Sequence, residues 1–312
     1  LWCIFFQKDW DIYKGNLDNL KEQKSYLCDL LQLIMTRIGE DGLEKFNDDE
    51  GRFLDWPSCE NPLAINAGVQ ALVIQAMKAG YELCSVLGED MLATKCEAVR
   101  RKMVNAAPKI IKPFLKSGMA PDAPGQKQAA SLLALTGLIS PKEANQKYLS
   151  VNGGHGFSTF YGYYMLQAMA AAGNYQGAID VIRQYWGAMI DLGDTTLWED
   201  FNLDWLPDAS RIDELVATGK KDIHRDYGDH CYKGFRHSLC HGWSSGPTSW
   251  LSEHVLGVQV VEPGCRVVRI TPHLGDLEWV EGTFPTPYGQ IVIRHEKGAD
   301  AKAVSYTHLR AH

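Results

Sequence analysis

The spacing of apolar residues changes once along this chain, near Gly257, and this change constrains the fold more than any other feature. Before Gly257, apolar side chains recur at the three-to-four-residue spacing of amphipathic α-helices. From Cys265 onward they alternate with polar residues at a period of two, and proline and glycine separate the alternating stretches. Helices followed by strands predict a mainly α domain with an appended β module.

The helical pattern predicts one helix from Asn16 to Ile38, which Gly39 and Gly42 end. Asn61 followed by Pro62 indicates another helix start, because asparagine caps helices and proline fits their first turn. We expect helices, joined in pairs by short loops, at Asn61–Gly88, Asp90–Ile111, Gln126–Leu138, Thr159–Ala172, Tyr175–Leu192 and Gly246–Gly257. We expect strands at Cys265–Ile270, Leu277–Glu281 and Gln290–His295.

The 312 residues are enough for one large domain and one small domain. We place the helical domain at 1–256 and the β module at 257–302. The first residues, Leu1–Phe6, have the composition of the middle of a buried helix, so we interpret the N-terminus as a truncation. Residues 303–312 contain VSYTHLRAH, which resembles translated adapter sequence in metagenomic gene predictions. We expect this tail to be non-native and to pack on nothing; the alternative is a genuine polar tail.

Charge and composition exclude several classes of function. The net charge is −7 and no cluster of five basic residues exists, so we expect no nucleic-acid partner. No stretch of eighteen apolar residues exists, so we expect no membrane span. Nine Trp and thirteen Tyr suit the apolar faces of sugars, or plain core packing.

The cysteines favour neither a metal nor a cofactor. They occur singly and form no CxxC pair, so we expect no zinc or redox motif and no cofactor, and we interpret most of them as buried free thiols. The eight are Cys3, Cys28, Cys59, Cys84, Cys96, Cys231, Cys240 and Cys265.

The segment Gly193–Trp205 is the strongest candidate for a functional site. It carries four carboxylates, among them Glu199 and Asp200, and two tryptophans, one of them Trp198, without helical or strand periodicity. Loops on a rigid scaffold commonly carry sites, and glycoside hydrolysis requires two carboxyl groups. A tryptophan ring can form a platform for a sugar or shield a carboxylate from water. A solvated acidic loop is the alternative.

Two other segments supply candidate binding residues. Ser238–Thr248 contains His241 and Trp243 among small residues just before a helix, where the histidine can bond a sugar hydroxyl, orient a carboxylate or be structural. Phe53–Pro62 contains further candidates ahead of a helix start, whose carboxylates could instead cap or charge that helix. They are Asp55, Trp56 and Glu60.

Several motifs in family order resemble the bacterial α-L-rhamnosidases of glycoside hydrolase family 78. The chain has Thr-Thr-Leu-Trp-Glu ending at Glu199, then Ser-Leu-Cys-His-Gly-Trp-Ser-Ser-Gly-Pro-Thr from Ser238. A strand ending Arg-Ile-Thr-Pro at Pro272 follows, then Gly-Asp-Leu-Glu-Trp and Glu-Gly-Thr-Phe-Pro-Thr-Pro-Tyr-Gly, which ends at Gly289. The resemblance extends from about residue 9 to 297 and is most specific over 193–289.

This resemblance implies a partial (α/α)6 toroid followed by a small antiparallel β-sandwich, and an inverting hydrolase that releases terminal α-L-rhamnose from glycosides or polysaccharides. It implies that Glu199 is the general base, that His241 contacts the sugar, and that Asp55 and Trp56 form a pair beside it. The family's general acid lies in an Asp-Glu-Arg type motif, and this sequence contains no Asp-Glu-Arg. We therefore expect the fragment to be inactive. The stretch 207–232 is longer than expected, which predicts a different substrate preference.

Two other interpretations stay open. The first is a non-catalytic carbohydrate-binding toroid. The second is another (α/α) toroid glycosidase or a polysaccharide lyase, although an acidic loop would repel the anionic substrate of a lyase. A bacterial periplasmic or extracellular location is compatible with the family, but the sequence contains no localisation signal.

Overall fold

The computed structural model describes residues 1–46, 52–58, 60–223, 237–298 and 303–311. The chain forms two compact units, each described by itself. Unit 1 consists of Leu1–Phe53, Asn66–Ser117 and Ser252–His312, and unit 2 consists of Leu54–Ile65 and Gly118–Leu251.

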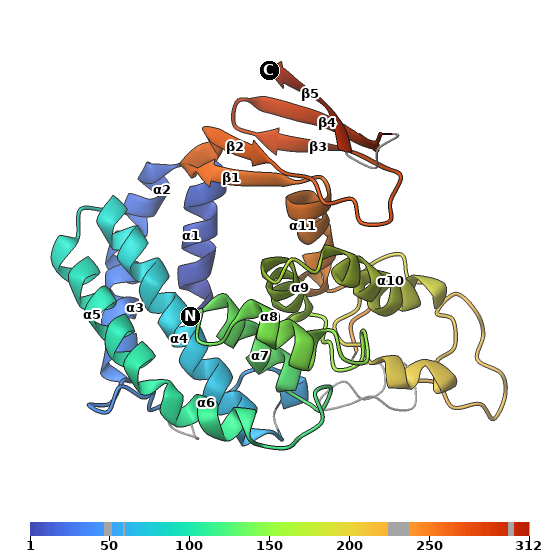
Figure 1. The fold of residues 1–312 in the computed structure, drawn as a ribbon, viewed down its shortest axis with the longest axis horizontal. Helices are drawn as coiled ribbons and strands as arrows, with labels where there is room; N and C mark the ends of the chain where they lie inside the picture. Colours follow the sequence, from blue (N-terminus) through green and yellow to red (C-terminus); the bar gives the residue numbers. More distant parts are fainter. Residues whose placement is uncertain (47–51, 59, 224–236, 299–302, 312) are drawn as a thin grey trace. The chain divides into compact units, whose positions relative to one another are not determined.

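Unit 1 contains the helices that come first along the chain, except for the first turn of the fourth helix (Figure 1). They are α1 (Trp2–Lys14), α2 (Leu17–Glu22), α3 (Lys24–Thr36), α4 (Pro62–Val86, whose first turn belongs to unit 2), α5 (Asp90–Ala106) and α6 (Pro108–Leu115). Gly15 ends α1 in the left-handed conformation, and the Asn16 side chain caps α2 by accepting from two backbone N–H groups. The prediction of one helix over Asn16–Ile38 is wrong in detail, because a break at Gln23 separates α2 from α3.

The β region of unit 1 consists of two antiparallel sheets, as Figure 1 shows. One pairs β1 (Val258–Glu262) with β2 (Val267–Ile270), and the other has the order β3 (Trp279–Thr286), β4 (Gly289–Lys297), β5 (Ala303–Ala311). Apolar side chains from both sheets pack into one cluster, formed by Leu256, Val258, Ile291 and Ile293 with Val268, Ile270, Val280 and Phe284 against them. The mainly α fold with a small antiparallel β region is therefore confirmed, and β1 is a strand that the sequence pattern did not predict.

The C-terminal tail corrects one expectation. Residues 303–311 pair with β4 in register from Gly289↔Ala311 to Lys297↔Ala303. The prediction that this tail packs on nothing is wrong for its backbone, because the free edge of β4 can bond any extended chain. Whether its sequence is native stays a prediction.

The compact units do not coincide with the predicted division at 256/257, because the β region lies in the same unit as α1. Helix α1 and the β region are in contact at Gly15. The backbone of Gly15 lies so close to Gly264 that a Cβ on Gly15 would stand 2.6 Å from the Gly264 Cα. The Cys265 thiol also donates to the Tyr13 carbonyl at 3.5 Å. Helix α1 itself is not the middle of a buried helix in this structure, since Phe6 is 60% exposed.

Unit 2 carries shorter helices separated by longer loops. They are the 3-10 turn η2 (Trp56–Ser58), α7 (Gln126–Leu135), α8 (Pro141–Ala144), the π-helical turn η3 (Asn145–Leu149), α9 (Gly162–Ala171), α10 (Tyr175–Asp191), the 3-10 turns η4 (Leu203–Asp208) and η6 (Gly242–Ser245), and α11 (Gly246–Trp250). Asn61 accepts from the Ala64 N–H at 3.1 Å, which confirms the predicted cap of α4. Among the described residues, no helix has the length and apolarity needed to cross a membrane.

Candidate active site

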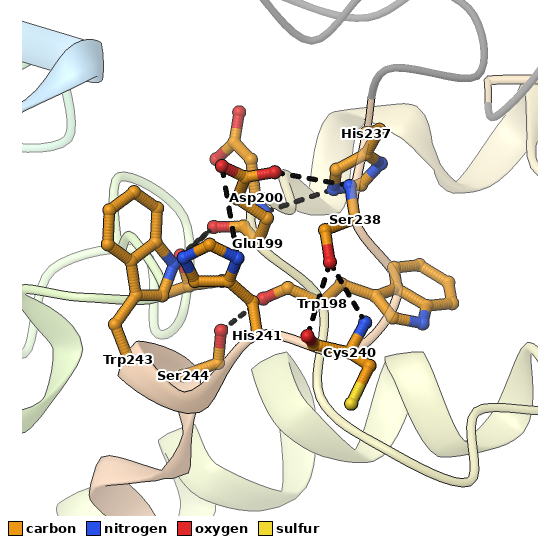
Figure 2. Close-up of polar contacts among 10 residues, drawn as sticks. Trp198, Glu199, Asp200, His237, Ser238, Cys240, His241, Trp243 and Ser244 are labelled. Carbon is orange, nitrogen blue, oxygen red and sulfur yellow. Dashed lines mark hydrogen bonds and ion pairs between the residues drawn. The ribbon is translucent and has the colours of Figure 1, made fainter.

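The acidic loop after α10 is anchored to the segment that contains His241. The Glu199 N–H donates to the Ser238 carbonyl at 2.9 Å, and the His241 N–H donates to the Leu197 carbonyl at 2.7 Å. These two bonds pair the segments like strands, so segments about forty residues apart meet in one place (Figure 2). All of these residues belong to unit 2.

The Glu199 carboxylate lies between a backbone donor and an imidazole. Its Oε2 accepts from the Ser238 N–H at 3.1 Å, and its Oε1 lies 3.9 Å from the His241 Nδ1 (Figure 2). The Glu199 side chain keeps 18% of its surface exposed, and that of His241 keeps 33%. A carboxylate that is oriented by fixed donors yet open to solvent can accept a proton from a water molecule.

The backbone of Glu199 is held as firmly as its side chain. Its carbonyl accepts from the Thr159 hydroxyl at 2.6 Å and from the Trp243 indole N–H at 2.7 Å. The Trp243 ring in turn lies 4.3 Å from the His241 ring, centroid to centroid. Trp243 therefore positions both members of the Glu199–His241 pair.

The Trp198 side chain points into the core and not to the surface of this loop. It is 0% exposed, packs edge-on against Phe201 with ring centroids 5.5 Å apart, and its carbonyl accepts from the Ser244 hydroxyl. Because no part of the ring is exposed, it offers no face to a sugar in this structure. Its contribution is to fill the space under Glu199.

Asp55 is buried and held by polar neighbours. Its Oδ2 accepts from the Ser158 hydroxyl at 2.6 Å and from the Gln128 amide at 3.5 Å, and its Oδ1 accepts from the Trp56 N–H at 3.0 Å. Burial raises the pKa of Asp55 to about 6, against these hydrogen bonds, which lower it. Since Ser158 bonds Asp55 and the next residue, Thr159, bonds Glu199, one dipeptide connects the two predicted carboxylate segments.

A cavity of about 640 Å³ is lined in part by residues of the acidic loop after Glu199. Asp200 faces it, is 7% exposed, and donates its backbone N–H to the His237 Nε2 at 3.0 Å. The lining contains carboxylates and aromatic rings: Pro57, Glu60, Asp122, Pro124, Asn152, His155, Gly156, Phe157, Asp200, Phe201, Asn202, Asp204 and Trp205. Of the predicted site residues, Glu60 and Asp200 line this cavity, whereas Glu199, His241, Asp55, Trp56, Trp198 and Trp243 do not.

Nearly the whole chain is similar in structure to solved proteins, and its last part matches a known family in sequence. Residues 257–308 match the family described as bacterial alpha-L-rhamnosidase C-terminal domain, and no curated protein matches the sequence. A GH78 family rhamnosidase of Bacillus sp. GL1 superposes with a TM-score of 0.72 and 21% identity over 97% of this chain. An α-L-rhamnosidase from Aspergillus terreus gives 0.70 and 16% over 95%.

The chain has the fold of the corresponding part of these two enzymes. The chain spans 31% of the length of the Bacillus enzyme and 34% of the Aspergillus enzyme. The predicted resemblance is thereby confirmed for the fold and for the C-terminal domain, whose match ends at residue 308, within β5.

The sequence pattern did not predict that residues in the stretch 152–157 line the cavity. The fully buried Lys127 holds this stretch, donating to the carbonyls of Val151 and Gly153 at 2.7 Å each. Burial lowers the pKa of Lys127 to about 8, although the nearby Asp122 acts in the opposite direction. The glycine-rich run that ends in Ser158-Thr159 was the sequence feature that could have indicated this wall.

Some predicted positions lie outside the described residues. Of the long stretch 207–232, residues 224–232 are among them, as are Cys59 and Cys231. The described cysteines are free. Cys84, Cys96 and Cys265 are buried as predicted, whereas Cys28 is partly buried and the prediction is wrong for Cys3 and Cys240, which are exposed.

Proposed function

We propose that this chain is part of an inverting glycoside hydrolase that releases terminal α-L-rhamnose from glycosides or polysaccharides. The observation that carries the proposal is the match of residues 257–308 to the rhamnosidase C-terminal domain, in a chain that has the rhamnosidase fold over 97% of its length. A bacterial, metagenomic source and a sandwich arrangement of the two sheets belong to the same proposal.

In this mechanism Glu199 is the general base. The Ser238 N–H orients one of its oxygens, and the other, on the His241 side, takes the proton of the water that attacks the anomeric carbon. His241 contacts a sugar hydroxyl, and Trp243 keeps it in place through the ring contact. In an inverting enzyme, a carboxylic acid on the opposite face protonates the leaving oxygen.

We assign the remaining candidates supporting or binding roles. Asp200 and Glu60 face the cavity, which has the mixture of carboxylates and aromatic rings that suits a neutral sugar. Asp55 acts through Ser158 and Thr159 on the Glu199 loop, and Trp56 supplies the N–H that orients Asp55. Trp198 supports the loop from below.

The test is Glu199→Gln in the full-length parent, assayed with an aryl α-L-rhamnoside. Glutamine keeps the shape but cannot take a proton, so kcat should fall by about 10²–10⁴ while KM changes little. Glu143→Gln, at a partly exposed glutamate of unit 2 that pairs with Lys147, is the matched control and should leave kcat unchanged. A Glu199→Gln enzyme with normal kcat would remove Glu199 from the mechanism.

We further propose that the isolated chain does not hydrolyse the substrate, because it contains no Asp-Glu-Arg motif to supply the acid. A turnover assay of the full-length parent separates this from a purely carbohydrate-binding role, because a binding-only parent would bind L-rhamnose without turnover at full length as well. If the isolated chain is active and Asp55→Asn abolishes that activity, Asp55 is the acid and the missing-acid proposal fails.

A further inference from the structure

A buried ammonium group lies against one wall of the cavity in unit 2. Lys127, the second residue of α7, is 0% exposed. Its Nζ donates to the carbonyls of Val151 and Gly153 at 2.7 Å each, and to that of Leu149 at 3.5 Å. An ammonium group has three donors, so these bonds use all of them. The same Nζ lies 5.0 Å from the centroid of the Phe157 ring, which lines the cavity.

The wall segment, residues 151–157, has a backbone that needs such an anchor. Asn152, Gly153 and Gly156 all lie in the left-handed region, with φ of 54°, 53° and 77°. A Cβ on Gly156 would stand 2.7 Å from the Asp122 carbonyl oxygen, so the segment is also packed tightly against the chain before α7. A left-handed conformation is unfavourable for asparagine and persists only where surrounding contacts hold it, which is common at ligand sites.

The wall segment presents two polar side chains to the cavity. Asn152 donates its amide to the Asp122 carboxylate at 2.5 Å, and the His155 Nδ1 lies 3.1 Å from the Asp204 Oδ1. All four residues line the cavity. An amide and an imidazole each carry a second polar atom, Oδ1 and Nε2, that these two contacts do not use. Both side chains are therefore oriented by one bond and can make another to a ligand.

We propose that Asn152 and His155 bind hydroxyl groups of the sugar substrate, and that Lys127 is the positioning residue that holds both in place. Hydroxyl groups of a neutral sugar both donate and accept hydrogen bonds, which matches an amide oxygen and an imidazole nitrogen. The carbonyls that Lys127 binds belong to the residues on either side of Asn152, so the ammonium group fixes the direction in which the amide points. The proposal rests on the proposed function.

The position of the cavity predicts which kinetic constant changes. Neither Glu199 nor His241 lines it, so a damaged wall segment weakens substrate binding and leaves the proton transfer at Glu199 unaffected. A residue that only supports the fold would not give this separation of KM from kcat.

The experiment compares variants of Lys127 in the full-length parent with an aryl α-L-rhamnoside. Lys127→Met keeps the length of the side chain but removes its donors, so KM should rise by about tenfold while kcat stays within about twofold. Lys127→Arg restores the charge and the donors and should recover most of this loss. Lys147→Met, at an exposed lysine of unit 2 that pairs with Glu143, is the matched control and should leave KM unchanged.

A second variant tests the wall segment even if Lys127→Met does not fold. Asn152→Gly removes the amide but keeps the backbone, because glycine adopts a φ of 54° without strain. We expect KM to rise about fivefold or more with little change in kcat. An unchanged KM in Asn152→Gly, or in a folded Lys127→Met, would overturn the proposal.

Hydrogen exchange separates failure of this proposal from failure of the proposed function. The Gly154 N–H donates to the Gln184 Oε1 at 2.7 Å, and in Lys127→Met its exchange should become faster, without any substrate present. A parent that shows this change but hydrolyses no rhamnoside refutes the proposed function. Titration of that parent with L-rhamnose then decides the role of the wall segment: weaker binding in Asn152→Gly supports it, and equal binding or no binding overturns it.

Discussion

At the scale of single residues, Asp55 makes stability depend on pH. Its pKa is raised from 3.8 to about 6, so between these values the folded state holds more protons than the unfolded state. Proton binding by Asp55 therefore stabilises the folded state. This stabilisation is fully present below about pH 4 and is lost as pH rises through about 6, which lowers the unfolding free energy by about 3 kcal/mol.

Comparison with Asp55→Asn isolates this effect, because asparagine stays neutral at every pH. We expect the difference in unfolding free energy, wild type minus variant, to fall by about 3 kcal/mol between about pH 4 and about pH 7. Urea denaturation of both proteins at several pH values measures it. A difference that does not change with pH would show that Asp55 is not desolvated in the folded protein.

The residues that sequence could identify were those with distinctive chemistry. Glu199 and His241 stand in recognisable motifs, and the structure brings them within 3.9 Å. Ser158 and Thr159 could not be singled out, because a hydroxyl gains its role only from the partner that folding brings to it. The same limit applies to Trp198, since a loop sequence does not say which of its rings points into the core.

At the scale of elements, the start of α7 depends on one glycine. Gly125 has φ +81°, and a Cβ there would stand 2.7 Å from the Ser58 Cβ and 2.9 Å from the Ala64 Cβ. This close approach, together with the Asn61 amide that donates to the Pro124 carbonyl at 2.8 Å, fixes α7 against the segment that carries Asp55.

Gly125→Ala should therefore destabilise the protein by about 3 kcal/mol or more, from backbone strain plus the clash. Gly137→Ala is the matched control, since Gly137 has φ +73° but open space around its Cβ position, and it should cost only about 1 kcal/mol. Equal losses in chemical denaturation would mean that the contact with Ser58 and Ala64 contributes nothing.

Helix positions were predictable and helix ends were not. The long predicted helix after Asp90 stops at Ala106 and resumes at Pro108 as α6. Periodicity does not reveal such a break, because the apolar face continues across it. The proline at the start of α6 is the local feature that marks the new helix.

At the scale of the whole molecule, the change of period near Gly257 was enough to predict a mainly α chain that ends in antiparallel sheets. The compact units could not be predicted, because they depend on contacts between distant parts of the sequence. Such a contact joins α1 and the turn at Pro263–Cys265, which are about 250 residues apart.

The final strand gives a prediction at this scale. If residues 303–312 are foreign to the fold, β5 pairs mainly through its backbone, which any extended sequence can do. Deleting 303–312 should then change the unfolding free energy by less than about 1 kcal/mol, measured by guanidinium denaturation. A loss of about 3 kcal/mol would identify β5 as native protein and the adapter interpretation as mistaken.

The paired segments at Glu199 and His241 also have an evolutionary consequence. Backbone bonds anchor both ends of the intervening chain, at Glu199 with Ser238 and at Leu197 with His241. The part of that chain after Trp205, the last residue of it that lines the cavity, can therefore lengthen, shorten or be replaced without displacing the carboxylate. Insertions there are under weak selection for folding, and relatives can drift in loop length while the anchored pair is preserved. Lineages with this arrangement can acquire new preferences by exchanging one loop.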